Sequence, residues 1–306
     1  RFTVYGYGRR RNSFHHRLHR FSQIINMDNQ WFKFTQCYSV SSVVSFDTPL
    51  VSNKSSGRKA TPITYNKMDL FNYSRRETSE VNIGAAPLGG SNPIRIQSMT
   101  NTATQDTEAC VAQAKRIVDA GGEYVRLTTQ GVKEAENLKN IHAALRDRGY
   151  NTPLSADIHF TPDAALVAAR YVEKVRINPG NFADKRATFQ KLTYTDEEYT
   201  GELERIRQKF SEFLAVCREH RTAVRIGTNH GSLSDRIMSR YGNTPAGMVK
   251  ATLEYLRICK ASDFKDVVIS LKSSDCRVMV EAVRLLVKEM EKEGMAFPLH
   301  LGVTEA

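Results

Sequence analysis

A chain of 306 residues with 41% hydrophobic and 25% charged residues is long enough to bury the core of one large α/β domain. It contains no run of about 18 apolar residues, so we expect no membrane-spanning helix. Most of the formal charge of +11 lies in residues 1–67, where eleven Lys and Arg residues face two acids. The remainder is nearly balanced, which argues against a general nucleic-acid-binding protein.

Residues 1–67 differ from the rest of the chain. They are rich in Arg, Ser and aromatic residues and show no sustained period of 2 or 3.6. We expect a basic, disordered leader here and a barrel domain over residues 68–306. The leader is either upstream sequence joined to a reading frame that starts at Met68, or a transit-like peptide. The first interpretation predicts a bacterial, cytoplasmic protein, and the second predicts a plastid protein.

The cysteines are few and scattered. None of the five forms a C-x-x-C pair, so neither a disulfide scaffold nor a self-contained zinc or iron–sulfur site is expected. We predict that all five are reduced and that this chain binds no metal: Cys37, Cys110, Cys217, Cys259 and Cys276.

Short apolar runs alternate with amphipathic stretches from about residue 80, which is typical of successive βα units. The pattern favours a TIM-like (β/α)8 barrel that is truncated after strand seven. A doubly wound open sheet is the alternative, although no Gly-x-Gly-x-x-Gly turn follows the first strand. The predicted strands are Ile94–Thr100, Tyr124–Thr129, Leu154–Ile158, Lys174–Asn178, Ala223–Thr228, Asp266–Lys272 and Leu299–Thr304.

Helix signals fill the segments between these strands. Capping side chains and prolines at the first helical position mark several starts, and glycines mark the ends. A long helix is predicted over Asp196–His220, with Leu203 among the residues on its buried side. The expected caps are Asp106, Thr161, Thr244 and Asp275.

Three of the strands share a Val-Arg-Ile/Leu core. Because alternate side chains of a strand point to opposite faces, the apolar residues would pack under helices while Arg126, Arg176 and Arg225 face the barrel interior. Lys272 adds a fourth cation. Four cations in one interior raise its free energy unless an anion neutralises them. We therefore predict a diphosphate-type ligand that the arginine side chains bind in bidentate fashion. The alternative is that the arginines only bridge barrel carboxylates.

Neutral and acidic side chains accompany these cations at the strand ends. Asn178 and Asn229 add donors, although both segments also look like ordinary turns. Asp157 and His159 lie two residues apart and suit a catalytic or orienting pair. Glu305 is a candidate proton donor or acceptor, with a salt bridge to an arginine as the equally weighted alternative.

Five segments together resemble one enzyme family, 4-hydroxy-3-methylbut-2-enyl diphosphate synthase of the large, GcpE-type form. They occur in the family's order and span about residues 68–306: Pro93–Thr100, Ala156–Phe160, Val175–Asn181, Arg225–Leu233 and Leu299–Ala306.

The resemblance implies reductive conversion of 2-C-methyl-D-erythritol 2,4-cyclodiphosphate to 4-hydroxy-3-methylbut-2-enyl diphosphate in isoprenoid biosynthesis. It implies electrons from a ferredoxin or flavodoxin, a homodimer at full length, and a [4Fe–4S] cluster in a separate C-terminal domain. Glu305 would be the acid/base, with less firmly assigned roles for Asp157 and His159, and this fragment alone would be inactive. The implied diphosphate-binding residues are Arg126, Arg176, Asn178, Arg225, Asn229 and Lys272.

Two other functions stay open. A non-redox barrel enzyme, such as an aldolase or a pterin-synthase-like transferase, would use the same cationic interior for a phosphorylated small molecule. A nucleic-acid-binding protein would act through the basic leader, and removal of residues 1–67 would then abolish its activity.

Overall fold

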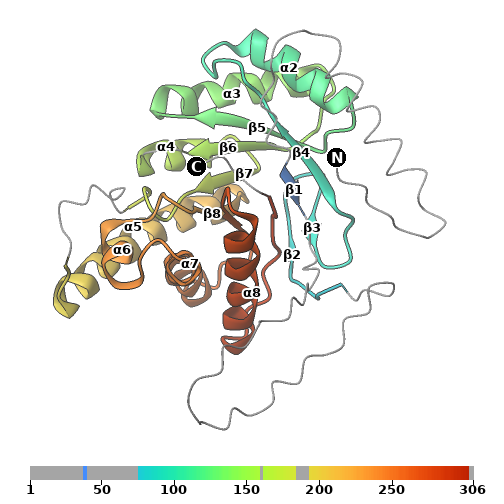
Figure 1. The fold of residues 1–306 in the computed structure, drawn as a ribbon. Coiled ribbons are helices and arrows are strands. Elements are labelled where there is room, and N and C mark those ends of the chain that lie inside the picture. Colours follow the sequence, from blue (N-terminus) through green and yellow to red (C-terminus); the bar gives the residue numbers. More distant parts are fainter. Residues whose placement is uncertain (1–36, 40–74, 159–160, 184–192, 303–306) are drawn as a thin grey trace.

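The computed structural model describes residues 37–39, 75–158, 161–183 and 193–302 (Figure 1). Its main sheet has the order β1-β4-β5-β6-β7-β8-β9, in which β4 to β9 run parallel. β1 (Cys37–Ser39) pairs antiparallel with β4 and lies in the segment expected to be a leader. The parallel strands are β4 Arg95–Met99, β5 Tyr124–Thr129, β6 Leu154–Ile158, β7 Lys174–Ile177, β8 Ala223–Asn229 and β9 Val267–Lys272.

These six strands confirm the first six predicted strands to within one residue at each end. Consecutive parallel strands need a long crossover, and each crossover here contains at least one helix. The helices surround the curled sheet (Figure 1). They are α2 Thr107–Asp119, α3 Val132–Asp147, α4 Pro162–Ala168, α5 Asp196–His220, α6 Asp235–Tyr241, α7 Pro245–Ala261 and α8 Cys276–Lys292.

The seventh predicted strand is only partly seen. Leu299 forms an isolated parallel bridge with Ile269 of β9, and the His300 amide donates to the Ile269 carbonyl at 2.7 Å. The segment therefore lies beside β9 as expected, but its described residues form a bridge rather than a strand. Residues 303–306 lie outside the described part of the chain.

Most of the predicted helix caps are confirmed. Asp106 accepts from the Ala109 amide at 3.0 Å, and Thr244 and Asp275 make equivalent cap hydrogen bonds. Thr161 is an exception, because its hydroxyl is buried and has no hydrogen-bond partner among the described residues. The start of α4 therefore depends on Pro162, whose fixed φ suits the first helical position. Leu203 of α5 is half-buried rather than buried.

A short hairpin that the sequence did not reveal closes one end of the barrel. Its strands, β2 (Glu80–Val81) and β3 (Leu88–Gly89), pair antiparallel. Val81 and Leu88 belong to one buried apolar cluster with Tyr124, Ala223 and Val268. Because these last three residues stand at the amino-terminal ends of their strands, the hairpin seals the end opposite the strands' carboxyl termini.

Candidate anion-binding site

Side chains alternate between the two faces of the parallel sheet. Val175 and Ile177 of β7 belong to the main hydrophobic core under the helices, so Arg176 between them faces the interior. Strand register places Arg176 opposite both Asp157 and Arg225. The inward orientation predicted for the three arginines is therefore confirmed. The inward-facing charged residues are Arg126, Asp157, Lys174, Arg176, Arg225 and Lys272.

Asp157 is the centre of this interior. It is the one acid within the bounds of β4 to β9, which contain six Lys and Arg residues, and it is 3% exposed. Its Oδ1 lies 3.0 Å from Arg176 Nη1 and its Oδ2 lies 3.2 Å from Arg126 Nη2. Of the six cations, Arg95 pairs separately with Glu123 at 2.9 Å. Asp157 thus bridges two of the predicted arginines.

Arg176 is fixed from the next strand as well. Its Nη2 donates to the Gly227 carbonyl at 2.9 Å. A Cβ atom at position 227 would lie 2.7 Å from Arg176 Nε, closer than real contacts allow, and 3.2 Å from Ser270 Oγ, which is a tight contact. The missing side chain of Gly227 therefore makes the room through which Arg176 reaches across β8.

Lys174 is an interior cation that the sequence prediction missed. It is 2% exposed, its Nζ donates to Gln97 Oε1 at 2.8 Å, and the same Nζ lies 4.1 Å from the centroid of the Tyr124 ring. A cation over an aromatic face is stabilised by the ring quadrupole. The signal was present in the sequence, because Lys174 has the same strand parity as Arg176.

His300 is a second residue that the prediction missed. It is 1% exposed, and its Nε2 has no hydrogen-bond partner among the described residues. Burial lowers the pKa of His300 well below its usual value, and the cations Arg225, Lys272, Lys174 and Arg126 lower it further. An uncharged imidazole thus lies among the interior cations.

The loops after β7 and β8 form the rim above these charges. Asn178 is buried and its Oδ1 accepts from the Gly180 amide at 3.2 Å, so it also stabilises the turn, as the alternative interpretation expected. Asn229 is half-buried and lies opposite Lys272 in the register of β8 and β9. The loop after Asn229 is held by Asn243, whose Oδ1 accepts from the Gly231 amide at 3.1 Å. Both predicted asparagines thus lie at the carboxyl end of the sheet.

His159 and Glu305 lie outside the described residues, so their predicted roles stay predictions. In the part of the chain that the structure describes, no group of three or more His, Cys, Asp and Glu residues could hold a metal ion. Cys110, Cys217, Cys259 and Cys276 are free, and burial raises the pKa values of Cys217 and Cys259. These residues do not fit an iron–sulfur cluster.

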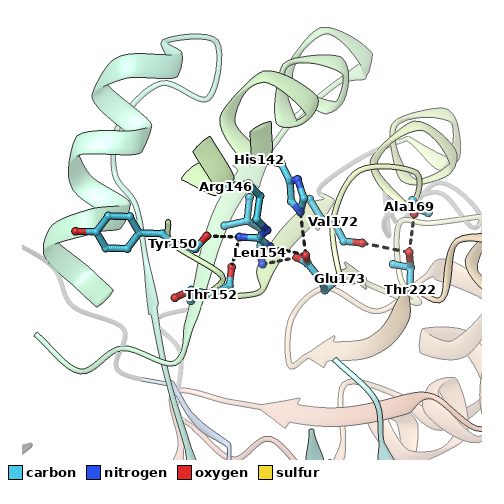
Figure 2. A network of polar contacts seen from close by, with 9 residues as sticks. All are labelled: His142, Arg146, Tyr150, Thr152, Leu154, Ala169, Val172, Glu173 and Thr222. Carbon is cyan, nitrogen blue, oxygen red and sulfur yellow. Dashed lines mark hydrogen bonds and ion pairs between the residues drawn. The ribbon is translucent and has the colours of Figure 1, made fainter. Parts of the chain in front are cut away.

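A separate polar network lies at the opposite, amino-terminal end of the strands (Figure 2). Glu173 Oε1 lies 2.9 Å from His142 Nε2 and 2.6 Å from Arg146 Nη2, and Oε2 accepts from the Leu154 amide at 2.7 Å. Burial alone would raise the pKa of Glu173, but these hydrogen bonds and Arg146 hold it below its usual value. Glu173 and His142 also line an open cavity of about 820 Å³ on this side of the molecule.

Comparison with known proteins gives a consistent result. Residues 78–306 match the GcpE TIM-barrel domain. The chain is 74% identical over 239 residues to a 4-hydroxy-3-methylbut-2-en-1-yl diphosphate synthase (flavodoxin) of Phocaeicola vulgatus, covering 78% of this chain and 39% of that relative. It is 53% identical over 232 residues to the protein of the same description in Protochlamydia amoebophila, covering 76% and 36%. The chain thus spans about two-fifths of the length of these relatives.

Among solved structures, a truncated 3-deoxy-D-arabino-heptulosonate 7-phosphate synthase from Thermotoga maritima superimposes with a TM-score of 0.43 at 14% identity. The superposition covers 73% of this chain and 68% of the other, and the similarity is too low to support any conclusion. None of the described helices is long and apolar enough to cross a membrane.

Proposed function

This chain belongs to the GcpE TIM-barrel family, and we propose that it forms the diphosphate-binding barrel of a 4-hydroxy-3-methylbut-2-enyl diphosphate synthase. The proposed reaction converts 2-C-methyl-D-erythritol 2,4-cyclodiphosphate to 4-hydroxy-3-methylbut-2-enyl diphosphate, a reductive step of isoprenoid biosynthesis. Relatives that carry this description match the barrel at up to 74% identity, which supports the assignment.

The observation that carries the proposal is the charge of the barrel interior. Five buried or half-buried cations face this interior, and two of them, Arg126 and Arg176, pair with Asp157, which is the one acid within the six parallel strands. Cations gathered in a desolvated interior repel one another, so an anionic ligand would be favoured there. Arginine forks match the geometry of phosphate oxygens, and a diphosphate offers several such oxygens.

Individual roles follow from the contacts. We assign Arg126, Arg176, Arg225 and Lys272 to the diphosphate, with the amide groups of Asn178 and Asn229 as neutral donors at the rim. Asp157 would position arginines rather than transfer protons, because both of its oxygens lie in ion pairs that favour its ionised form. Glu305 remains the proposed acid/base, and His159 remains a proposed catalytic or orienting residue.

The reductive part of the reaction requires groups beyond the described residues. We propose that a [4Fe–4S] cluster is held elsewhere in the full-length enzyme, since the described cysteines and carboxylates do not form a site for it. When bound, the cluster would supply electrons. The names of the relatives specify flavodoxin, so a flavodoxin or a ferredoxin is the proposed donor. We further propose a homodimeric, cytoplasmic enzyme at full length.

Calorimetric titration of 2-C-methyl-D-erythritol 2,4-cyclodiphosphate into the 306-residue chain tests the barrel's share of this function. We expect the double variant Arg176→Ala, Arg225→Ala to lose at least about 100-fold in affinity, because each arginine contributes a charge-assisted hydrogen bond. Arg207→Ala is the matched control, since Arg207 pairs with Glu204 on the exposed face of α5. A folded wild-type chain that gives no binding heat would contradict the proposal.

A further inference from the structure

The loops after β7 and β8 touch each other through their backbones. Gly180, in the first loop, is buried against Ser232 in the second. A Cβ atom at position 180 would lie 1.6 Å from the Ser232 carbonyl oxygen and 2.8 Å from its carbonyl carbon, closer than real contacts allow. The φ angle of Gly180 is not positive, so close approach rather than an unusual backbone conformation requires glycine here.

Each side of this contact is joined to one of the two rim asparagines. The Gly180 amide donates to Asn178 Oδ1 at 3.2 Å, and the Ser232 amide donates to the Asn229 carbonyl at 3.1 Å. Asn229 ends β8 and lies four residues after Arg225, so alternation along the strand turns its side chain to the interior. The contact between the loops therefore fixes the position of Asn229 relative to Asn178.

The loop after β7 is buried and firmly packed. Residues 178–180 are buried, and the Tyr255 hydroxyl donates to the Pro179 carbonyl at 3.4 Å. Phe182, which follows them, is also buried, and its ring centroid lies 5.6 Å from that of Phe213 on α5. Because protein interiors are close-packed, this loop has little room to move away from its neighbour.

The tip of the loop after β8 is more exposed. His230 and Ser232 are half-buried, and Gly231 is exposed. Two contacts hold this tip to Asn243, which is itself exposed: the Gly231 amide donates to Asn243 Oδ1 at 3.1 Å, and His230 Nε2 lies 3.1 Å from the Asn243 carbonyl oxygen. A group forced between the two loops would therefore displace the loop after β8, and Asn229 would move with it.

We propose that Gly180 is a positioning residue for ligand binding. Its lack of a side chain holds the loop after β8 where the amide group of Asn229 reaches an anion at the carboxyl end of the barrel. The inference rests on the proposed function, because it takes Asn229 as a donor to the bound diphosphate. A purely structural Gly180 would differ in one respect, since its replacement would lower affinity whatever side chain stands at position 229.

A double-mutant cycle separates these two roles. Calorimetry gives the affinity of the 306-residue chain for 2-C-methyl-D-erythritol 2,4-cyclodiphosphate in wild type, Gly180→Ala, Asn229→Ala and the double variant. Each single variant should lose about tenfold, because each removes one hydrogen bond to a charged group. The double variant should also lose only about tenfold, since both changes remove the same hydrogen bond. A loss of about 100-fold, the product of two independent effects, would overturn the inference.

Gly131→Ala is the matched control. Gly131 also lies at the carboxyl end of the strands, in the loop after β5, and its φ of −152° suits any residue. A Cβ atom there would meet Glu134 Oε2 at 3.4 Å, which is an ordinary contact. The affinity of this variant should equal that of wild type. A loss as large as that of Gly180→Ala would show that the contact with Ser232 has no special role, and the inference would be wrong.

Asn229→Ala alone also tests the inference. This change adds no bulk, so it gives an answer even if Gly180→Ala does not fold. An affinity equal to that of wild type would mean that Asn229 does not contact the ligand, and Gly180 would then have no donor to position.

Inorganic diphosphate, as a second probe, separates this inference from the proposed function. If it binds with the non-additive pattern while the cyclodiphosphate does not bind, the proposed substrate is wrong and the inference stands. If the cyclodiphosphate binds and the two substitutions act independently, the inference alone is wrong. Absence of binding for both anions would overturn both.

Discussion

Two polar networks, one at each end of the strands, are each built around a single buried or half-buried carboxylate. Glu173, at the amino-terminal end, accepts hydrogen bonds from a histidine, an arginine and a backbone amide, so its charge is matched by neighbours (Figure 2). Asp157, in the interior, bridges Arg126 and Arg176, while Lys174, Arg225 and Lys272 bring further positive charge to the same space.

The difference between the networks indicates which one stabilises the fold and which one we propose to bind an anion. A carboxylate with matched partners orders the loops that it joins and leaves no net charge for a ligand. Within the described strands cations outnumber acids in the interior, so an added anion would stabilise that interior. The two networks therefore use similar residue types but differ in their balance of positive and negative charge.

The largest expected effect comes from the interior carboxylate. Asp157→Asn keeps the shape of the side chain but leaves Arg126 and Arg176 close together without their shared acid. Removal of one partner of a buried ion pair is strongly destabilising, so the free energy of unfolding should fall by about 3 to 5 kcal/mol. Urea denaturation measures the change, and Glu204→Gln on the exposed face of α5 should change little.

Added sulfate provides a second measurement on the Asp157→Asn variant. It should restore more stability to Asp157→Asn than to wild type, because the anion replaces the missing negative charge. A variant as stable as wild type and indifferent to sulfate would show that the interior is not the charged site described above.

A smaller loss of stability is expected from a change at Glu173, at the amino-terminal end of the strands. Glu173→Gln loses charge-assisted hydrogen bonds from Arg146 and His142, so the free energy of unfolding at pH 7 should fall by about 2 to 3 kcal/mol. The folded-state pKa of Glu173 lies below its ordinary value of 4.5. Its contribution is therefore present above pH 4.5 and is lost as the pH falls through the folded pKa.

Denaturation of wild type and Glu173→Gln at several pH values checks this sign. The two proteins should differ at pH 7 and converge in acid, while their affinities for sulfate at pH 7 stay equal. A loss of sulfate affinity in Glu173→Gln would mean that the two networks are not independent.

The sequence predicted the parts of this arrangement that depend on alternation along one strand. The Val-Arg-Ile pattern was sufficient to place Arg126, Arg176 and Arg225 in the interior, and the six strands lie within one residue of their predicted bounds. The same rule would also have placed Lys174 in the interior. The two-residue strands of the β2–β3 hairpin are too short to show any period.

The rest depends on contacts between strands, which one sequence does not show. The sharing of Asp157 between two arginines requires the register of β5, β6 and β7. The inward face of His300 follows only from the bridge between Leu299 and Ile269. Thr161 had the sequence signature of a cap, but its hydroxyl does not reach a helix amide.

The smallest expected loss of stability comes from a change at Gly227. This change tests how closely the interior fixes the positions of its cations. Gly227→Ala forces a methyl group against Arg176 Nε and Ser270 Oγ, and such overpacking should cost about 1 to 2 kcal/mol. Sulfate affinity should fall by about tenfold, because Arg176 must move away from Asp157 and the Gly227 carbonyl. Gly201→Ala is the matched control, since Gly201 is exposed within α5 with open space around it, and helix propensity predicts a gain of about 1 kcal/mol. If Gly227→Ala lost stability but kept full affinity, Arg176 would be a structural partner of Asp157, and the proposed anion binding would depend on the other interior cations instead.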